Sequence, residues 1–264
     1  MKKILLYAVG CVVIVLCVVC YFAFTQTREL QECKSEQDKI SGCVQKEYYE
    51  NGKPMYETPY KNGERHGVQK VYYENGKLKS EILYQNDKTH GVAKGYYESG
   101  NLMREIPYKN DVQHGVEKWY YENRNLEFEA PYDNGKKHGV VKEYYENGIL
   151  RYETPYENGK RHGVGKEYDE NGNLEIETPF KNGKLHGVEK WYYKNGNLKY
   201  EIPYENDKRH GIAKRYYENG NLQAQVTYEN GNMVSGVCGD GKEIDIQELK
   251  YWDTQDPISE VCKE

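Results

Sequence analysis

A unit of 24 residues is repeated eight times in succession from Val44 to about Gly231. A fixed period of this length is typical of repeat architectures, in which each unit is too small to bury a core alone and is stabilised by stacking on its neighbours. Any function is therefore expected either on a surface that stacking creates or at the two ends of the array.

Each unit contains two runs of alternating polar and apolar residues separated by Asn-Gly, which is the strongest short-range signal for a two-residue hairpin turn. With Asn75-Gly76 as the turn, Tyr73 is predicted to face Leu78, and Lys70 to face Glu81. Lysine faces glutamate in seven of the eight units and fails to do so only at Lys214/Gln225, so a slip of register is disfavoured. A second Asn-Gly, as at Asn62-Gly63, joins one unit to the next. The sequence predicts an all-β, single-layer antiparallel meander of β-hairpins over residues 44–233.

Proline occupies one position near the end of the second run in six units: Pro59, Pro107, Pro131, Pro155, Pro179 and Pro203. Proline has no N–H group to donate to the strand ladder, so we expect a bend or bulge there. A regular bend would curve the ribbon and turn one face into a groove. His66 is expected opposite Pro59.

The two faces of the ribbon are predicted to differ in variability. One face carries almost unvarying columns, such as those of Val68 and Lys70, and the other carries the most variable column: Glu47, Val71, Gly95, Trp119, Glu143, Glu167, Trp191 and Arg215. Under this register Trp119 faces Phe128, and Trp191 faces Tyr200. Trp and Tyr are enriched at binding hot spots, so the candidate partner-binding residues are Trp119, Tyr121, Phe128, Trp191, Tyr193 and Tyr200. The alternative is that these aromatic pairs only fill gaps between side chains.

The N-terminal region contains 21 uncharged, mostly apolar residues from Ile4 to Phe24, enough for a membrane-spanning helix of about 31 Å. Lys2 and Lys3 would keep the N-terminus cytoplasmic and place the repeats outside the cytoplasm. Residues 1–25 are thus predicted to be a single-pass membrane anchor, residues 26–43 a linker and N-terminal cap, and residues 234–264 a C-terminal cap. A cleaved signal peptide, giving a secreted protein, and a lipoprotein modified at Cys11 are the alternatives.

Four cysteines flank the array: Cys33 and Cys43 before it, Cys238 and Cys262 after it. Their positions favour disulfides that hold the two caps, as in an exported protein. Four free thiols are the alternative, and the absence of Cys-x-x-Cys spacing argues against zinc. The seven histidines recur once per repeat, at spacings of about 9.6 Å, too far apart for neighbours to share a metal ion. They are expected to pack the inter-repeat turns, with a shared response to pH near 6.5 as the alternative. No metal or cofactor is predicted.

Several classes of function are disfavoured. The net charge of -5 is spread over alternating Lys and Glu, without the basic block that nucleic acid requires. No phosphate-binding loop, nucleophile elbow or His-Glu-x-x-His motif is present, and a repeat ribbon lacks a single deep pocket, so no enzyme is predicted.

The unit His-Gly-Val-x-Lys-x-Tyr-Tyr-Glu-Asn-Gly-x-Leu-x-x-Glu-x-Pro-Tyr-x-Asn-Gly resembles the bacterial MORN repeat variant, as in the YwqK-type antitoxin family. The resemblance implies a β-hairpin solenoid that contacts proteins or lipids. We therefore expect a membrane-anchored, non-enzymatic scaffold that binds a partner protein or lipid. The alternative is an antitoxin or immunity protein that binds and occludes a toxin. Self-association through the edge strands near Val44 and Tyr228 is a third expectation.

Overall fold

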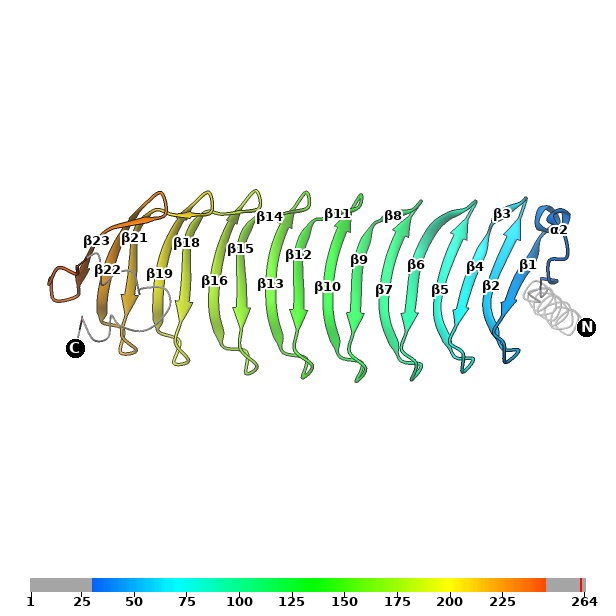
Figure 1. The fold of residues 1–264 in the computed structure, drawn as a ribbon, viewed down its shortest axis with the longest axis horizontal. Helices are drawn as coiled ribbons and strands as arrows, with labels where there is room; N and C mark the ends of the chain where they lie inside the picture. The colour runs from blue at the N-terminus through cyan, green and yellow to red at the C-terminus, as the bar shows by residue number, and fades with distance from the viewer. Residues whose placement is uncertain (1–29, 246–261, 263–264) are drawn as a thin grey trace, which may run out of the picture.

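The structure is a computed structural model that describes residues 30–245 and 262, and these residues form one antiparallel sheet of 23 strands. The long strands lie side by side in chain order, with helix α2 (Glu36–Ser41) at one end and strand β23 (Asn232–Cys238) at the other (Figure 1). This arrangement confirms the predicted single-layer meander of eight repeats.

Each repeat contributes two long strands, and most repeats are joined by a strand of two residues. The first long strands are β1 (Cys43–Tyr48), β4 (Gly67–Tyr72), β6 (Lys88–Tyr96), β9 (Gly115–Tyr120), β12 (Gly139–Tyr144), β15 (Gly163–Tyr168), β18 (Gly187–Tyr192) and β21 (Gly211–Tyr216). The second are β2 (Pro54–Lys61), β5 (Leu78–Gln85), β7 (Leu102–Lys109), β10 (Leu126–Asp133), β13 (Leu150–Glu157), β16 (Leu174–Lys181), β19 (Leu198–Glu205) and β22 (Leu222–Glu229). The short strands are β3 (Glu64–Arg65), β8 (Val112–Gln113), β11 (Lys136–Lys137), β14 (Lys160–Arg161), β17 (Lys184–Leu185) and β20 (Lys208–Arg209).

The prediction that a transmembrane helix belongs to the fold is wrong for the described chain. Within residues 30–245, no helix is long and apolar enough to cross a bilayer. Helix α2 has six residues and ends at Ser41, because the next residue, Gly42, has a φ of +105° that leaves the helical region. The segment on which the membrane helix was predicted, Ile4 to Phe24, lies outside the described residues.

The two Asn-Gly turns of a repeat have different conformations. At Asn62-Gly63 both residues have positive φ, 54° and 80°, as a two-residue type I′ turn requires. At Asn75-Gly76 only the glycine does, with φ of 88°. Its amide donates to the carbonyl of Tyr73 at 2.8 Å, and the Tyr73 amide donates to the carbonyl of Lys77 at 2.8 Å. This turn is therefore a three-residue loop that ends in a glycine bulge.

The glycine bulge changes the predicted register at the loop and leaves the rest of the hairpin intact. Lys70 pairs with Glu81 as predicted, whereas the predicted pairing of Tyr73 with Leu78 is wrong. Leu78 instead pairs with Tyr72, because the register shifts after Val71. The freed Tyr73 side chain reaches the neighbouring repeat.

Lysines and glutamates form one alternating row across the ribbon. Lys70 lies opposite Glu81 of its own hairpin and also opposite Glu57 of the preceding repeat. Pairs between repeats include Lys142 with Glu129, where Nζ and Oε1 are 3.3 Å apart, and three others of the same kind: Lys94–Glu81, Lys166–Glu153 and Lys214–Glu201. A tyrosine adds to each such contact, as where the Tyr144 hydroxyl donates to Glu129 at 3.0 Å. The charges predicted to fix each hairpin therefore also join neighbouring repeats.

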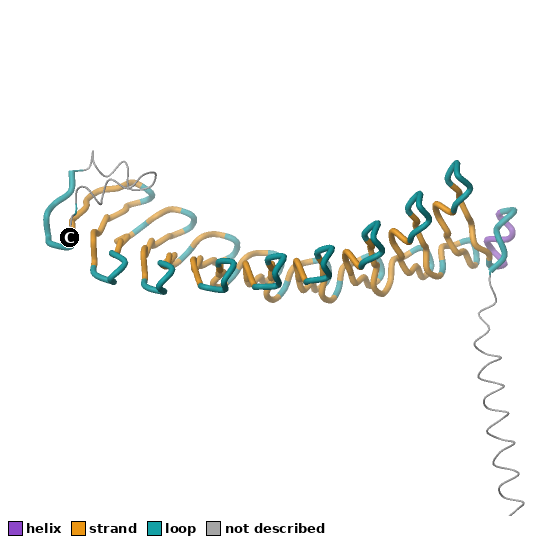
Figure 2. Tube along the Cα trace, turned by 90° about the horizontal axis from the view of Figure 1, so that it is seen from below, coloured by secondary structure: helices purple, strands orange, loops and turns teal. Residues whose placement is uncertain are grey.

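The predicted bend lies where the recurring proline of the repeat meets the His-Gly pair. The His66 amide donates to the Pro59 carbonyl at 2.9 Å, which confirms their expected proximity. Four residues, 66–69, lie opposite only residues 58–59 at this point. Gly67 has φ of +118°, and a Cβ atom there would lie 2.9 Å from Pro59 Cγ. Repetition of this bulge accompanies the curvature of the ribbon (Figure 2).

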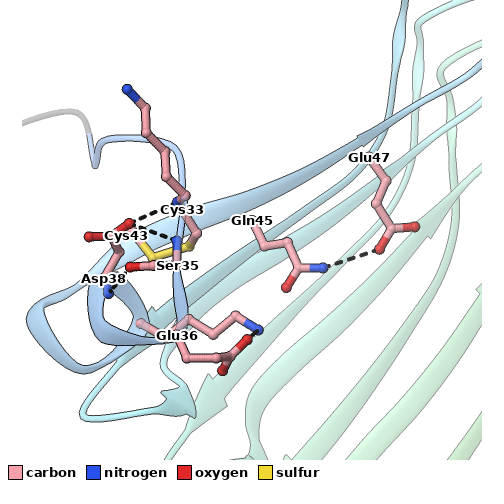
Figure 3. Close-up of polar contacts among 9 residues, drawn as sticks. Cys33, Ser35, Glu36, Asp38, Cys43, Gln45 and Glu47 are labelled. Carbon is pink, nitrogen blue, oxygen red and sulfur yellow. Dashed lines mark hydrogen bonds and ion pairs between the residues drawn. A yellow bond between two sulfur atoms is a disulfide. The ribbon is translucent and has the colours of Figure 1, made fainter.

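The N-terminal cap takes the place of a preceding repeat. The carbonyls of Lys39 and Ile40 in α2 accept hydrogen bonds from the Asn62-Gly63 turn, both at 3.0 Å. Ser35 begins the helix with a capping box: its amide donates to Asp38 Oδ2 at 2.9 Å, and the Asp38 amide donates to its Oγ at 3.3 Å (Figure 3). The disulfide between Cys33 and Cys43 ties this cap to β1 (Figure 3).

The C-terminal cap takes the place of a following repeat. The carbonyl of Cys262 accepts the Tyr217 hydroxyl at 2.8 Å and thereby replaces a backbone acceptor of a ninth unit. A disulfide joins Cys262 to Cys238 on β23, and both side chains belong to a buried cluster with Val226 and Tyr228. Each end of the array is thus covered by a short segment that a disulfide joins to the sheet.

Candidate functional site

The variable face of the ribbon is the face that carries the column of Val71 and its equivalents, together with the columns of Ile82 and Tyr84. Cross-strand pairs on this face include Val71 with Ser80 and Gly67 with Tyr84. Most buried side chains of the array lie here, including Tyr84, Ala130, Val141, Phe180 and Ile202. The opposite face, which we call the ladder face, carries the Lys/Glu row and the column of Val68. The variable face thus combines burial with sequence variation.

Trp119 is held in place by three neighbours. Its strand β9 pairs with β10 so that Trp119 lies directly opposite Phe128, as predicted. The indole Nε1 donates to Glu117 Oε1 at 2.6 Å. On the other side, the Arg104 guanidinium lies 5.3 Å from the ring centroid, within range of a cation–π interaction. The ring is half-buried and has a fixed orientation.

A groove of about 500 Å³ opens beside Trp119, between the fourth and fifth repeats. Its lining includes Tyr121 and Phe128, so three of the six predicted binding residues come together here. The Tyr121 hydroxyl is occupied by a hydrogen bond to the Tyr144 carbonyl at 2.7 Å, which leaves its ring as the contact surface.

The other three predicted residues lie on the same ribbon, three repeats farther along. Trp191 faces Tyr200 across β18 and β19, as predicted, and is 38% exposed. The Tyr193 hydroxyl donates to the Tyr216 carbonyl at 2.8 Å. The six residues therefore form two separate aromatic positions, and the groove of about 500 Å³ belongs to the first of them.

Sequence reasoning missed the polar floor of this groove. Glu117 is 8% exposed, accepts the Trp119 indole and lies 3.5 Å from Gln113 Nε2. Burial, followed by the negative charge of Glu117, raises the pKa of Tyr132 to about 12, so its hydroxyl stays protonated. A signal was present in the sequence, because Gly-Val-Glu-Lys-Trp-Tyr-Tyr occurs at 115–121 and again at 187–193.

The histidines lie at the turns between repeats. His66 Nδ1 lies 3.3 Å from Asn86 Oδ1, and His114 Nδ1 lies 3.3 Å from Asp133 Oδ1. In residues 30–245 and 262, no group of three or more His, Cys, Asp or Glu side chains could hold a metal ion. These contacts fit the packing role expected of the imidazoles.

Both strands named as edges have partners within the described chain. Val44 donates to the carbonyl of Gln31, and its own carbonyl accepts the amide of Cys33, both at 2.9 Å. Tyr228 pairs with Met233 of β23. Self-association through these edges stays a prediction.

The repeat array has the geometry of a hairpin solenoid whose units match a known family. The family model described as "MORN repeat variant" matches residues 44–62, 65–86, 89–110, 113–134, 137–158, 161–182, 185–206 and 209–230. These matches cover more than half of the chain, which therefore belongs to the MORN repeat variant family.

Comparisons with individual proteins add little to this assignment. No curated protein matches the chain. Among solved structures, it is similar to one described as "Crystal Structure of TcdB2-TccC3-Cdc42", at 12% identity over 74% of this chain, with a TM-score of 0.16. A structure described as "Crystal Structure of TcdB2-TccC3" is similar at 12% identity over 74% of this chain, with a TM-score of 0.17. The chain spans 14% of the length of each of those chains.

Proposed function

We propose that this MORN repeat array is a non-enzymatic scaffold that binds a partner protein through its variable face. The observation that carries the proposal is the groove of about 500 Å³ beside the fixed Trp119 ring, on a face whose residues differ from repeat to repeat. Half-buried, oriented aromatic rings in a concave site are the usual anchors of protein interfaces. The Lys/Glu row of the unvarying ladder face, by contrast, is committed to contacts between repeats.

The test compares captured partners between variants of the two faces. Trp119→Ala/Trp191→Ala removes both aromatic anchors from the variable face. Val116→Ala/Val188→Ala is the matched control, because these valines lie on the same two strands, point to the ladder face and are both 44% exposed. We expect the tryptophan variant to lose a partner that the valine variant retains. Equal recovery of the same partner by both would reject the variable face as the binding surface.

A lipid partner is the second candidate, and a specific observation favours it. On the ladder face, an unbroken apolar column of half-exposed side chains runs along the ribbon: Val68, Val92, Val116, Val140, Val164, Val188 and Ile212. Contiguous exposed apolar surface is typical of interaction sites. Binding to phosphatidylcholine vesicles that is lost in Val116→Ala/Val188→Ala and retained in the tryptophan variant would support this candidate over the first.

The YwqK-type antitoxin role is a finer form of the protein-binding proposal. In that role the same variable face would cover the active surface of a toxin. It predicts that co-expression of the chain restores growth to cells producing the toxin, and that Trp119→Ala/Trp191→Ala does not. A toxin neutralised equally by both forms would exclude occlusion by this face.

We further propose that the repeats work in an oxidising compartment, as an exported or secreted protein does. The support is the pair of disulfides at the two ends, since such bonds persist mainly outside reducing cytosol. Rapid acid quenching of cells, followed by thiol labelling, should find Cys33, Cys43, Cys238 and Cys262 blocked. Free thiols at all four would contradict export.

A further inference from the structure

Three turns between repeats bring together positive charges that the sequence keeps apart. Residues 133–138, 157–162 and 181–186 are separated by one repeat each, and they lie next to one another along the edge of the ribbon that carries β11 and β14 (Figure 1). Their six cations are Lys136, Lys137, Lys160, Arg161, Lys181 and Lys184. Against these stand two carboxylates, Asp133 and Glu157, so the net charge is +4. We call these three turns the basic strip.

The basic strip has limits along and across the ribbon. The turns on either side of it, residues 109–114 and 205–210, each contain equal numbers of cations and carboxylates. On the opposite edge of the same repeats, the loops 121–125, 145–149 and 169–173 together hold four carboxylates and one cation. A chain with a net charge of -5 thus concentrates positive charge on one short edge.

One column of lysines recurs in the same position in all three turns. Lys136, Lys160 and Lys184 each follow an Asn-Gly pair in which both residues have positive φ, and all three lysines are exposed. The two carboxylates lie beside imidazoles instead: Asp133 beside His114, and Glu157 Oε2 3.7 Å from His162 Nδ1. Within residues 30–245 and 262, none of the three lysines forms an ion pair. Their ammonium groups are therefore open to a ligand.

The spacing of these lysines matches an extended polypeptide. One repeat adds two strands, so successive lysines are about 9.6 Å apart along the edge. A polyproline II helix has three residues per turn and rises about 3.1 Å per residue, so it presents the same side about every 9.3 Å. A β-strand does so about every 6.8 Å, and an α-helix about every 5.4 Å or, over two turns, about 10.8 Å. Over the whole strip, the polyproline II period departs from the lysines by only about 0.6 Å.

We propose that the basic strip binds an acidic segment of a partner polypeptide in the polyproline II conformation, with a carboxylate at every third position. The inference goes beyond the proposed function, because it adds a second contact surface at the edge of the ribbon. Lys136, Lys160 and Lys184 each pair with one carboxylate, and the other cations of the strip add to the attraction. Acidic segments extend by self-repulsion, so little further ordering opposes binding.

The experiment uses the full chain and two fluorescein-labelled peptides of the same composition. In the spaced peptide the unit Glu-Pro-Pro occurs three times; in the clustered peptide three adjacent glutamates precede six prolines. Both peptides are rich in proline, so they differ mainly in the spacing of their carboxylates. Fluorescence anisotropy at low salt should show about threefold or more tighter binding of the spaced peptide. Added salt should weaken that binding.

A triple variant tests the lysine column. Lys136→Gln/Lys160→Gln/Lys184→Gln should weaken binding of the spaced peptide about tenfold, because three exposed ion pairs are lost. Its thermal melt should match that of the unmodified chain, since these side chains make no ion pairs within the described residues.

The matched control removes the same charge from the opposite edge. Lys53→Gln/Lys77→Gln/Lys194→Gln changes three exposed lysines in the loops there, and it should alter binding by less than about twofold. Equal binding of the two peptides, or equal losses in the two triple variants, would overturn the proposal. Linear polyphosphate is the third probe. If it binds the strip and neither peptide does, the strip recognises a phosphate polymer and the proposal is wrong.

The outcome is distinguishable from failure of the proposed function. If Trp119→Ala/Trp191→Ala loses its partner while the two peptides bind equally, the variable face stands as the binding surface and the inference about the basic strip falls. If the spaced peptide binds selectively but the tryptophan variant keeps its partner, the basic strip stands and the variable face is rejected.

Discussion

A ladder of tyrosine hydroxyls links each repeat to the next, and it is interrupted once. The Tyr145 hydroxyl donates to the Tyr168 carbonyl at 2.9 Å, and the equivalent bonds from Tyr49, Tyr73, Tyr97, Tyr121 and Tyr193 are 2.7–2.8 Å long. In the sixth repeat this position is Asp169. Its carboxylate bonds within its own turn, mainly to Asn173, and these bonds lower its pKa to about 2. The link from the sixth to the seventh repeat therefore lacks one hydrogen bond.

We expect Asp169→Tyr to be more stable than Asp169→Phe. Both variants lose the aspartate contacts and gain a ring, so they differ only in a hydroxyl that can donate to the Tyr192 carbonyl. A neutral hydrogen bond of this kind contributes about 1 kcal/mol net, within a range of about 0.5–1.5, or roughly a fivefold change in the opening equilibrium. Because a repeat contacts only its neighbours, the change should be local. Hydrogen exchange of the β18 amides measures it.

The control is Tyr145→Phe, which removes an existing hydroxyl one repeat earlier. It should speed exchange in β15 by a similar factor and leave β18 unchanged. Indistinguishable exchange in β18 for Asp169→Tyr and Asp169→Phe would refute the idea that the hydroxyl ladder stabilises the stacking of repeats.

Three further predictions concern the bend, the tyrosines and the C-terminal cap. In Gly139→Ala the new Cβ would lie 2.9 Å from Pro131 Cγ at a φ of +110°, and the substitution should lower the free energy of unfolding in urea by about 2–4 kcal/mol. In Gly148→Ala the nearest atom is 3.8 Å from the new Cβ, and the loss should be about 1–2 kcal/mol. Equal costs would contradict a crowded bend. Burial raises the pKa of Tyr144 from 10.0 to about 12, so its stabilisation is complete below pH 10 and is lost as the pH rises towards 12; circular dichroism should show a shallower alkaline loss in Tyr144→Phe. Cys238→Ala/Cys262→Ala removes a disulfide between residues 24 apart and leaves Cys33–Cys43 in place; it should cost about 3–4 kcal/mol and speed exchange in β22 and β23 alone. Uniform acceleration would argue against a local cap.

Much of the fold could be predicted because the strand register inferred from one copy of the unit can be checked in the other copies. Lys70 opposite Glu81 could be checked in copy after copy, and one consistent pairing fitted the array. The loop at Asn75-Gly76 could not be predicted in the same way. A two-residue type I′ turn and a three-residue loop ending in a glycine bulge both place Asn-Gly at the bend, so the dipeptide does not distinguish them. In the structure the loop ends in a glycine bulge, and the Tyr73 hydroxyl donates to the Tyr96 carbonyl of the next repeat.

The candidate site was predictable only in part, for a related reason. Cross-strand pairing within one hairpin places Trp119 opposite Phe128, and the sequence predicts this pairing because it predicts the hairpin register. The role of Glu117 depends instead on side-chain packing on the variable face, where the Trp119 indole and Gln113 reach its carboxylate, and strand register does not specify this packing. Alternating charge along the strand made this glutamate look like another solvent-exposed residue.

The bonds between repeats also determine how such an array can change in length. The tyrosine hydroxyl bonds span 23 residues and the Lys/Glu contacts recur with the unit, so deleting one whole unit, for example residues 140–163, would offer every remaining group an equivalent partner. Deleting a single residue would instead turn a strand over. The distance between Trp119 and Trp191 can therefore change only in steps of one unit, about 9.6 Å for two strands. A partner that contacts both tryptophans must therefore match one of these discrete distances.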